Sequence, residues 1–111
     1  MIKIHIARDP EGFIWEFTVE GHAGYGGKGK DIVCAAVSAV AYTAIGALED
    51  VAGIKINYTI QDSGYMMCSI PVDIPYDKKP EVRTILETIA VGFKQIMLSY
   101  EKYVTVLDEE V

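Results

Sequence analysis

The first twenty residues alternate between apolar and polar side chains, a pattern typical of β-strands with one buried face. Residues 1–6 carry isoleucine at every second position, with His5 on the opposite, polar face. Residues 13–19 alternate in the same way, and the Asp-Pro-Glu-Gly sequence at 9–12 is a strong turn signal. We therefore expect the first two strands to form a hairpin.

A polar, glycine-rich stretch at residues 21–30 separates this hairpin from a long apolar segment. Glycine loses much conformational freedom in regular structure, so the stretch predicts a loop. From Asp31 the chain continues without charge to Leu48, which predicts a helix buried on most of its circumference, capped by Asp31 and ended by Gly53. Its 17 uncharged residues are slightly short for a ~30 Å bilayer, which favours a buried core helix over a membrane span.

The second half of the chain repeats both patterns. Alternation predicts three further strands, and apolar residues at intervals of three and four predict a second, amphipathic helix. The expected elements are strands at 54–60 and 65–70, a helix over 82–100 and a strand at 103–107. We expect residues 108–110 to form a solvated acidic end.

The order of these elements, β-β-α-β-β-α-β, predicts a single α+β domain over 1–111 in which a mainly antiparallel sheet carries two helices. A first helix that is apolar nearly all round needs cover on more than one side, and one sheet with one further helix would not supply it. We therefore expect a homodimer that uses this surface, unless the alanines of the helix simply tolerate exposure.

Composition narrows the possible functions. The 111 residues include 10 Lys and Arg against 16 Asp and Glu, a formal net charge of −6 at pH 7. Binding to phosphates depends on clustered basic side chains, so direct contact with nucleic acid is disfavoured. Two cysteines without a signal-peptide pattern are interpreted as reduced thiols in a cytoplasmic protein.

Cys34 falls in the first turn of the predicted helix, immediately after the polar loop. With Asp31 as the cap, Cys34 is the third helical residue, where unpaired N–H groups and the helix dipole favour a negative charge. Such a position, or a neighbouring imidazolium, can lower the pKa of a thiol from ~8.5 to between about 3.5 and 7.5. His22, at the end of the second strand, could be that neighbour. The alternative is a buried structural cysteine, the role we assign to Cys68.

The glycine loop also fits two phosphate-binding patterns. Gly24, Gly26 and Gly29 satisfy G-x-G-x-x-G, and residues 24–30 satisfy the first seven positions of G-x-x-x-x-G-K-[ST]. However, Asp31 replaces the Ser or Thr that would bind magnesium, and a parallel βαβ scaffold is hard to build from hairpins.

A metal site is a weaker alternative, because no pair of the candidate ligands has the short spacing of a zinc site. These ligands are His5, His22, Cys34 and Cys68. We expect no metal and no cofactor.

Two short runs on either side of the loop carry a family resemblance. Gly21-His22-Ala23, followed after the glycine-rich gap by Asp31-x-Val33-Cys34-Ala35-Ala36-Val37-Ser38, resembles the signature of the ribosomal-processing cysteine protease family, often called Prp. Length and element order are also similar over essentially the whole chain. The resemblance implies a bacterial cytoplasmic endopeptidase, a homodimer, that removes an N-terminal extension from a large-subunit ribosomal protein.

The same resemblance implies that His22 and Cys34 are the catalytic dyad, and Asp31 and Ser38 also match family positions. Asp31 either caps the helix, worth about 1 kcal/mol, or orients His22 as the third member of a triad, and we favour the cap. Ser38, one turn after Cys34, either hydrogen-bonds in the site or bonds back to its own helix. The N–H groups of Val33 and Cys34 are candidates for an oxyanion hole.

Under this hypothesis the loop is a gate that closes over an extended substrate peptide. The gate comprises Gly24, Tyr25, Gly26, Gly27, Lys28 and Gly29, with Tyr25 and Lys28 as weak candidates for substrate contact. Tyr42 would line a hydrophobic subsite or belong to the core. A non-enzymatic alternative is a ribosome-assembly factor that binds the same protein without cutting it, and Cys34 would then be dispensable.

Overall fold

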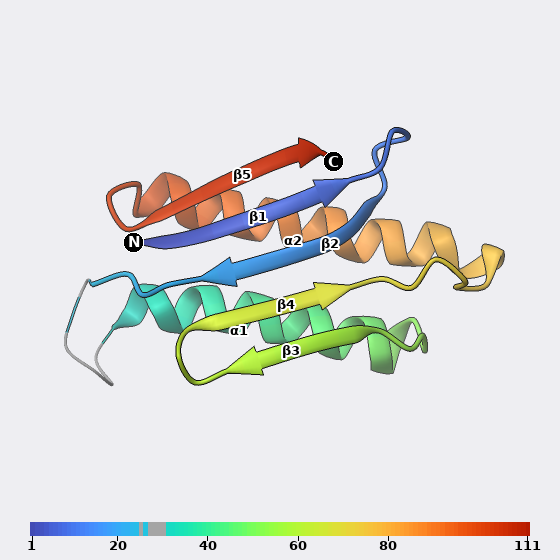
Figure 1. Ribbon diagram of the computed structural model, residues 1–111, viewed down its shortest axis with the longest axis horizontal. Helices are drawn as coiled ribbons and strands as arrows, with labels where there is room; N and C mark the ends of the chain where they lie inside the picture. Colours follow the sequence, from blue (N-terminus) through green and yellow to red (C-terminus); the bar gives the residue numbers. More distant parts are fainter. Residues whose placement is uncertain (25, 27–30) are drawn as a thin grey trace.

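The computed structural model describes residues 1–24, 26 and 31–111, and its elements follow the predicted order (Figure 1). The strands are β1 (Ile2–Arg8), β2 (Ile14–Glu20), β3 (Asn57–Gln61), β4 (Tyr65–Ser69) and β5 (Val104–Glu110). The helices are α1 (Ile32–Gly46), which continues as the π-helical turn η1 (Ala47–Val51), and α2 (Lys79–Ser99), which follows the 3-10 turn η2 (Tyr76–Lys78). The predicted α+β class is confirmed.

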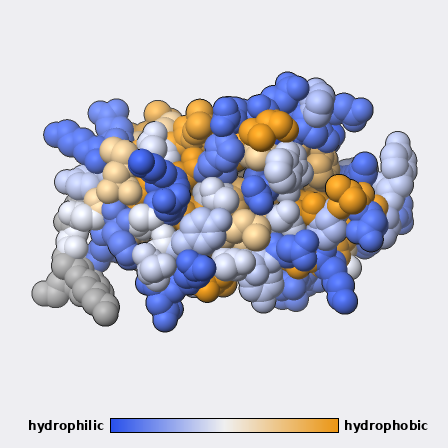
Figure 2. Space-filling model, in the orientation of Figure 1, coloured by the Kyte–Doolittle hydropathy of each residue, from blue (hydrophilic) through white to orange (hydrophobic). Residues whose placement is uncertain are grey.

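The five strands form one sheet in the order β3-β4-β2-β1-β5. All neighbouring strands are antiparallel except β1 and β5, which run parallel. Both helices lie side by side on one face of the sheet, so the fold has two layers (Figure 1). Figure 2 shows the open face, where hydrophilic side chains predominate and hydrophobic ones are scattered.

The hydrophobic core fills the space between the sheet and the two helices. Ile2, Ile4 and Ile6 of β1 are at most 2% exposed, as the alternation of that strand predicts. On the same side, Phe17 of β2 meets Phe93 of α2 edge to face, with ring centroids 5.5 Å apart. Each fully buried side chain of this size contributes roughly 1.5–3 kcal/mol of hydrophobic stabilisation.

The predicted alternation of the second strand is interrupted by a bulge. The pairing of β1 with β2 shifts register between Ala7 and Arg8, which pair with Glu16 and Ile14. The extra residue in β2 turns the strand, so Ile14 and Phe17 both face the core although they are three positions apart. A strictly alternating strand would have placed them on opposite faces.

The prediction of a solvated acidic end at residues 108–110 is confirmed for the exposed Glu109 and Glu110 but is wrong for Asp108, which is half-buried. Strand β5 extends to Glu110 because it pairs along its whole length with β1. Asp108 also accepts hydrogen bonds from Arg8 Nε on β1 and Lys94 Nζ on α2, each at 2.7 Å. The pKa of Asp108 is lowered to about 2, because the hydrogen bonds from Arg8 and Lys94 outweigh the effect of burial.

Helix α1 is not buried on most of its circumference, which corrects the prediction. Its buried residues form one stripe, comprising Val33, Val37, Ala41, Ala44 and Ile45. Ile32 and Tyr42 are 54% and 51% exposed, because a two-layer fold covers only one side of a helix. The segment Ile32–Val51 is long and apolar enough to cross a membrane by length and composition alone, but core helices pass the same test. Here its buried stripe belongs to the core.

Candidate active site

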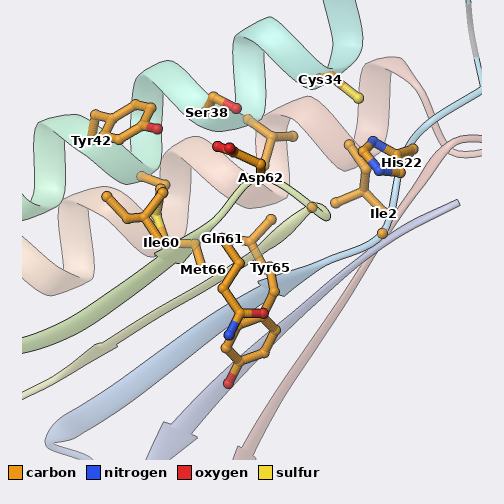
Figure 3. A pocket seen from close by; sticks show the side chains of 15 residues that line it. Ile2, His22, Cys34, Ser38, Tyr42, Ile60, Gln61, Asp62, Tyr65 and Met66 are labelled. Carbon is orange, nitrogen blue, oxygen red and sulfur yellow. The ribbon is translucent and has the colours of Figure 1, made fainter.

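The predicted dyad residues lie at one end of a groove between α1 and the β3–β4 hairpin. His22 follows β2, and Cys34 is the third residue of α1. Both side chains line a groove of about 280 Å³, in which Figure 3 places them at the same end. Both cysteines of the protein are free thiols.

Asp31 is the N-cap of α1, as predicted. It has an extended conformation, φ −80° and ψ 98°, and its Oδ1 accepts hydrogen bonds from the N–H groups of Val33 and Cys34, both at 3.0 Å. These two N–H groups lack partners within the helix, so the carboxylate satisfies them. They are consequently occupied by Asp31 in this conformation, and their role as an oxyanion hole stays a prediction.

Cys34 lies close to the residue that follows His22. The N–H of Ala23 donates a hydrogen bond to Cys34 Sγ at 3.4 Å. Burial raises the pKa of the Cys34 thiol above its ordinary value, the Ala23 N–H lowers this pKa, and the hydrogen bond and charge of Asp31 raise it again. The expected thiolate at the helix start is thus not favoured here, mainly because of burial and further because Asp31 takes the N–H groups and adds a negative charge.

His22 is held by the turn between β3 and β4. Its Nε2 lies 3.1 Å from the carbonyl oxygen of Ser63. A carbonyl oxygen can only accept, so Nε2 carries a proton in this contact, and in the neutral ring Nδ1 then holds the lone pair. Among the described residues no hydrogen bond joins the imidazole to Cys34 Sγ, although both groups face the same groove.

Ser38 lies one turn after Cys34 and lines the groove. Within the described part of the chain its hydroxyl makes no hydrogen bond, whereas the exposed Thr43 on the same helix donates to the carbonyl of Ala39 at 2.6 Å. Of the two predicted roles for Ser38, the bond back to the helix is not formed. Its hydroxyl is available to a molecule in the groove.

Most of the predicted substrate gate lies outside the described residues, namely Tyr25, Gly27, Lys28 and Gly29. Gly24 has a φ of +72°, and Gly26 is exposed. The gate therefore stays a prediction. The phosphate-binding alternative loses support, because Asp31 occupies the helix N–H groups that a phosphate would need. Moreover, β2 pairs with β4 in the antiparallel direction, whereas the phosphate-binding scaffold needs parallel strands.

The four candidate metal ligands are spread over the fold. His5 lies on the open sheet face, where its Nε2 is 2.7 Å from Glu109. Cys68 is buried in β4, where burial raises the pKa of its thiol to about 12. In the ranges that the structure describes, no three His, Cys, Asp or Glu side chains gather closely enough to hold a metal ion.

The second wall of the groove was missed by the sequence reasoning. It comes from the β3–β4 hairpin, with Ile60, Asp62 and Tyr65 among its lining residues (Figure 3). This hairpin reaches His22 because β4 pairs with β2, and no local pattern encodes that pairing. Tyr42, which the sequence left open between subsite and core, is half-exposed and lines the groove.

The chain resembles known proteins over nearly its full length. Residues 1–105 match the family model of cysteine protease Prp. The chain is 29% identical to the ribosomal processing cysteine protease Prp of Bacillus subtilis over 102 aligned residues. The alignment covers 91% of each protein. It is 32% identical over 109 residues to the protein of that name from Mycoplasma genitalium, covering 98% of this chain and 97% of the relative. A crystal structure of the essential ribosomal processing protease Prp from S. aureus, in complex with a covalently linked product peptide, superposes with a TM-score of 0.86 at 27% identity. That match covers 98% of this chain and 100% of the other.

Proposed function

The chain belongs to the cysteine protease family Prp, and from this premise we propose that it removes an N-terminal extension from a large-subunit ribosomal protein in the bacterial cytoplasm. The observation that carries this proposal is the arrangement of His22 and Cys34 at one end of a single groove. The names of the relatives support the class of substrate, and the covalently linked product peptide in the S. aureus protein supports a covalent step.

In the proposed mechanism, His22 acts through Nδ1 as the general base that takes the proton from Cys34 Sγ. The Ala23 N–H, which already points at the sulfur, stabilises the thiolate as the proton leaves. The thiolate attacks the scissile carbonyl, His22 returns the proton to the leaving amine, and water hydrolyses the thioester. The raised pKa of Cys34 agrees with this order, since the neutral thiol ionises only when a base accepts its proton.

The groove suits an extended peptide with basic residues. Tyr42 and Ile60 offer apolar surface, and Asp62 places a carboxylate beside it (Figure 3). The whole protein carries a net charge of −6. Proteins that bind RNA are rich in Lys and Arg, so an acidic enzyme attracts such a substrate at low ionic strength.

We also propose that the protein is a homodimer that uses the uncovered side of α1 and the neighbouring edge strand β3. Tyr58 and Ile60 pair with Cys68 and Met66, so they project from the helix-bearing face of the sheet. Tyr58, which does not line the groove, is nevertheless 48% exposed. A second copy would remove this apolar surface from water.

Sedimentation velocity tests the dimer. A Tyr58→Glu variant should sediment as a monomer, whereas Tyr76→Glu, at a residue 86% exposed outside this surface, should sediment like the unmodified protein. An unmodified protein that is monomeric at micromolar concentration would contradict the dimer.

The protease activity is tested by intact mass spectrometry of a ribosomal protein with its N-terminal extension, after incubation with the unmodified protein, Cys34→Ala or Cys68→Ala. We expect loss of an N-terminal peptide with the unmodified protein and with Cys68→Ala, and no loss with Cys34→Ala. Cleavage by Cys34→Ala would contradict the assigned nucleophile. Binding without cleavage by all three proteins would favour the assembly-factor alternative.

A further inference from the structure

We propose that the turn between β3 and β4 positions the imidazole of His22, with the Ser63 carbonyl as its orienting acceptor and Gly64 as the residue that leaves room for the ring. The inference rests on the proposed function, in which His22 is the general base. It assigns to a main-chain group the role that a carboxylate or amide side chain plays in the catalytic triads of other proteases.

The hydrogen bond from His22 to the turn fixes the tautomer of the ring. Nε2 lies 3.1 Å from the Ser63 oxygen and must donate to it. Asp31, the other candidate orienter, uses its Oδ1 to cap α1. With the proton on Nε2, Nδ1 is the atom that can accept the thiol proton.

Gly64 has two independent reasons to lack a side chain. Its φ is +93°, a conformation that glycine adopts readily and asparagine tolerates. In addition, a Cβ at this position would lie 2.8 Å from His22 Nε2 and 2.9 Å from Cε1, closer than van der Waals contact permits. The backbone conformation alone therefore disfavours a side chain, and any Cβ at this position would in addition displace the His22 ring.

The same turn also holds the backbone that carries His22. The N–H of Gly21 donates to the Gly64 carbonyl at 2.8 Å, and the N–H of Gly64 donates to the main-chain carbonyl of Gln61 at 3.1 Å. Gly21 is itself constrained, with a φ of +94° and space for a Cβ blocked by the Met1 carbonyl oxygen at 2.6 Å. Both the ring and the preceding peptide of His22 are therefore held by one turn.

This arrangement supports the reaction when the imidazole becomes charged. As Nδ1 takes the proton from Cys34, the ring becomes an imidazolium, and the Nε2–H bond to the Ser63 carbonyl becomes charge-assisted and stronger. The turn thus favours the charged intermediate as well as the productive ring orientation. Ser63 and Gly64 are positioning residues, because they act on the substrate only through His22.

The tautomer can be measured without any substrate by ¹⁵N NMR of the histidine rings in the Cys34→Ala protein. The His22 signals are assigned by comparison with a His22→Gln variant, since His5 is the other histidine. We expect the neutral His22 ring to carry its proton on Nε2. A neutral ring protonated on Nδ1 would overturn the proposal.

Kinetics provides the second test. Gly64→Ala should lower kcat at least about tenfold with little change in KM, because misplacement of a catalytic group by about 1 Å is costly. The matched control is Gly12→Ala, which introduces the same backbone strain at φ +86° but has no atom within 4 Å of the new Cβ. Equal kcat values for the two variants would overturn the positioning role. An Nε2–H ring in a protein that cleaves no substrate would instead contradict the proposed function alone.

Discussion

Polar side chains pair with one another in one half of the molecule and line a groove in the other. In the β1–β5–α2 half, Arg8 donates hydrogen bonds to Glu87 and Asp108, and Lys94 donates to Asp108. In the α1–β3–β4 half, Cys34 and Ser38 face an open groove. Charged side chains that pair with one another stabilise the fold. Polar side chains that line a groove can instead interact with a bound ligand.

Two aspartates illustrate the difference. Asp108 accepts from two cations, which lower its pKa to about 2. Asp31 accepts from two peptide N–H groups and lies beside a thiol, whose pKa it raises. The same side chain therefore stabilises the first half through paired charge, and in the second half it fixes the start of the helix that carries the proposed nucleophile.

The largest expected effect is a difference in activity between variants of the two histidines, one of which lies in each half. His22→Ala should lower kcat/KM by roughly 10²–10⁴, the range for removal of a general base. His5→Ala should leave kcat/KM within about twofold, since His5 pairs with Glu109 on the open sheet face, away from the groove. Rates of peptide cleavage measured for both variants check this. Similar losses in both would remove the functional distinction between the halves.

Asp108→Asn sharpens the comparison from the stability side. The pKa of Asp108 is lowered in the folded state, so its contribution is fully present above the unfolded pKa of ~3.9 and is lost as pH falls toward about 2. Because Asp108 is partly exposed, we expect about 1–2 kcal/mol of destabilisation near pH 7, shrinking in this acid range. Urea unfolding at several pH values measures it.

The control for this measurement is Asp73→Asn, at an exposed residue outside the ion-pair network. Its free energy of unfolding should stay within about 0.5 kcal/mol of the unmodified value. Cleavage activity at pH 7 should be unchanged in Asp108→Asn. A pH-independent loss of stability would mean that packing, and not charge, accounts for the role of Asp108.

Features that depend on neighbouring residues were predictable from the sequence. The cap by Asp31 and the place of Cys34 in the first turn both follow from a few consecutive residues. The order of strands and helices was equally readable, because each element has its own period. The bulge in β2 was not, since the extra residue is defined only by pairing with β1.

Features that depend on distant pairing could not be predicted. Asp108 looked like part of a solvated tail because Arg8, its partner, lies 100 residues earlier. Ser63 and Gly64 lie between the strands predicted at 54–60 and 65–70, and only the pairing of β4 with β2 brings them to His22. The dyad itself was inferred from a family resemblance, which supplied the long-range information that periodicity lacks.

Asp31→Asn separates the two effects of the cap residue. Asparagine is as good an N-cap as aspartate, so stability should change by only a few tenths of a kcal/mol. Loss of the negative charge removes one cause of the raised Cys34 pKa, and the limb of the pH–rate profile that reports thiol ionisation should move to lower pH. The profile of kcat/KM against pH measures this. An unchanged profile would mean that Asp31 acts as a cap alone.

Ser38→Ala should have the smallest effect. It compares a hydroxyl that faces the groove with one that is already hydrogen-bonded within the helix. The Ser38 hydroxyl faces the groove, and a hydrogen bond to a bound peptide contributes about 0.5–1.5 kcal/mol, so KM should rise roughly two- to tenfold. Stability should not fall, because alanine favours helix. Thr43→Ala on the same helix is the matched control: its hydroxyl already bonds to Ala39, so KM should not change. Equal KM values for the two variants would show that the Ser38 hydroxyl does not bind substrate.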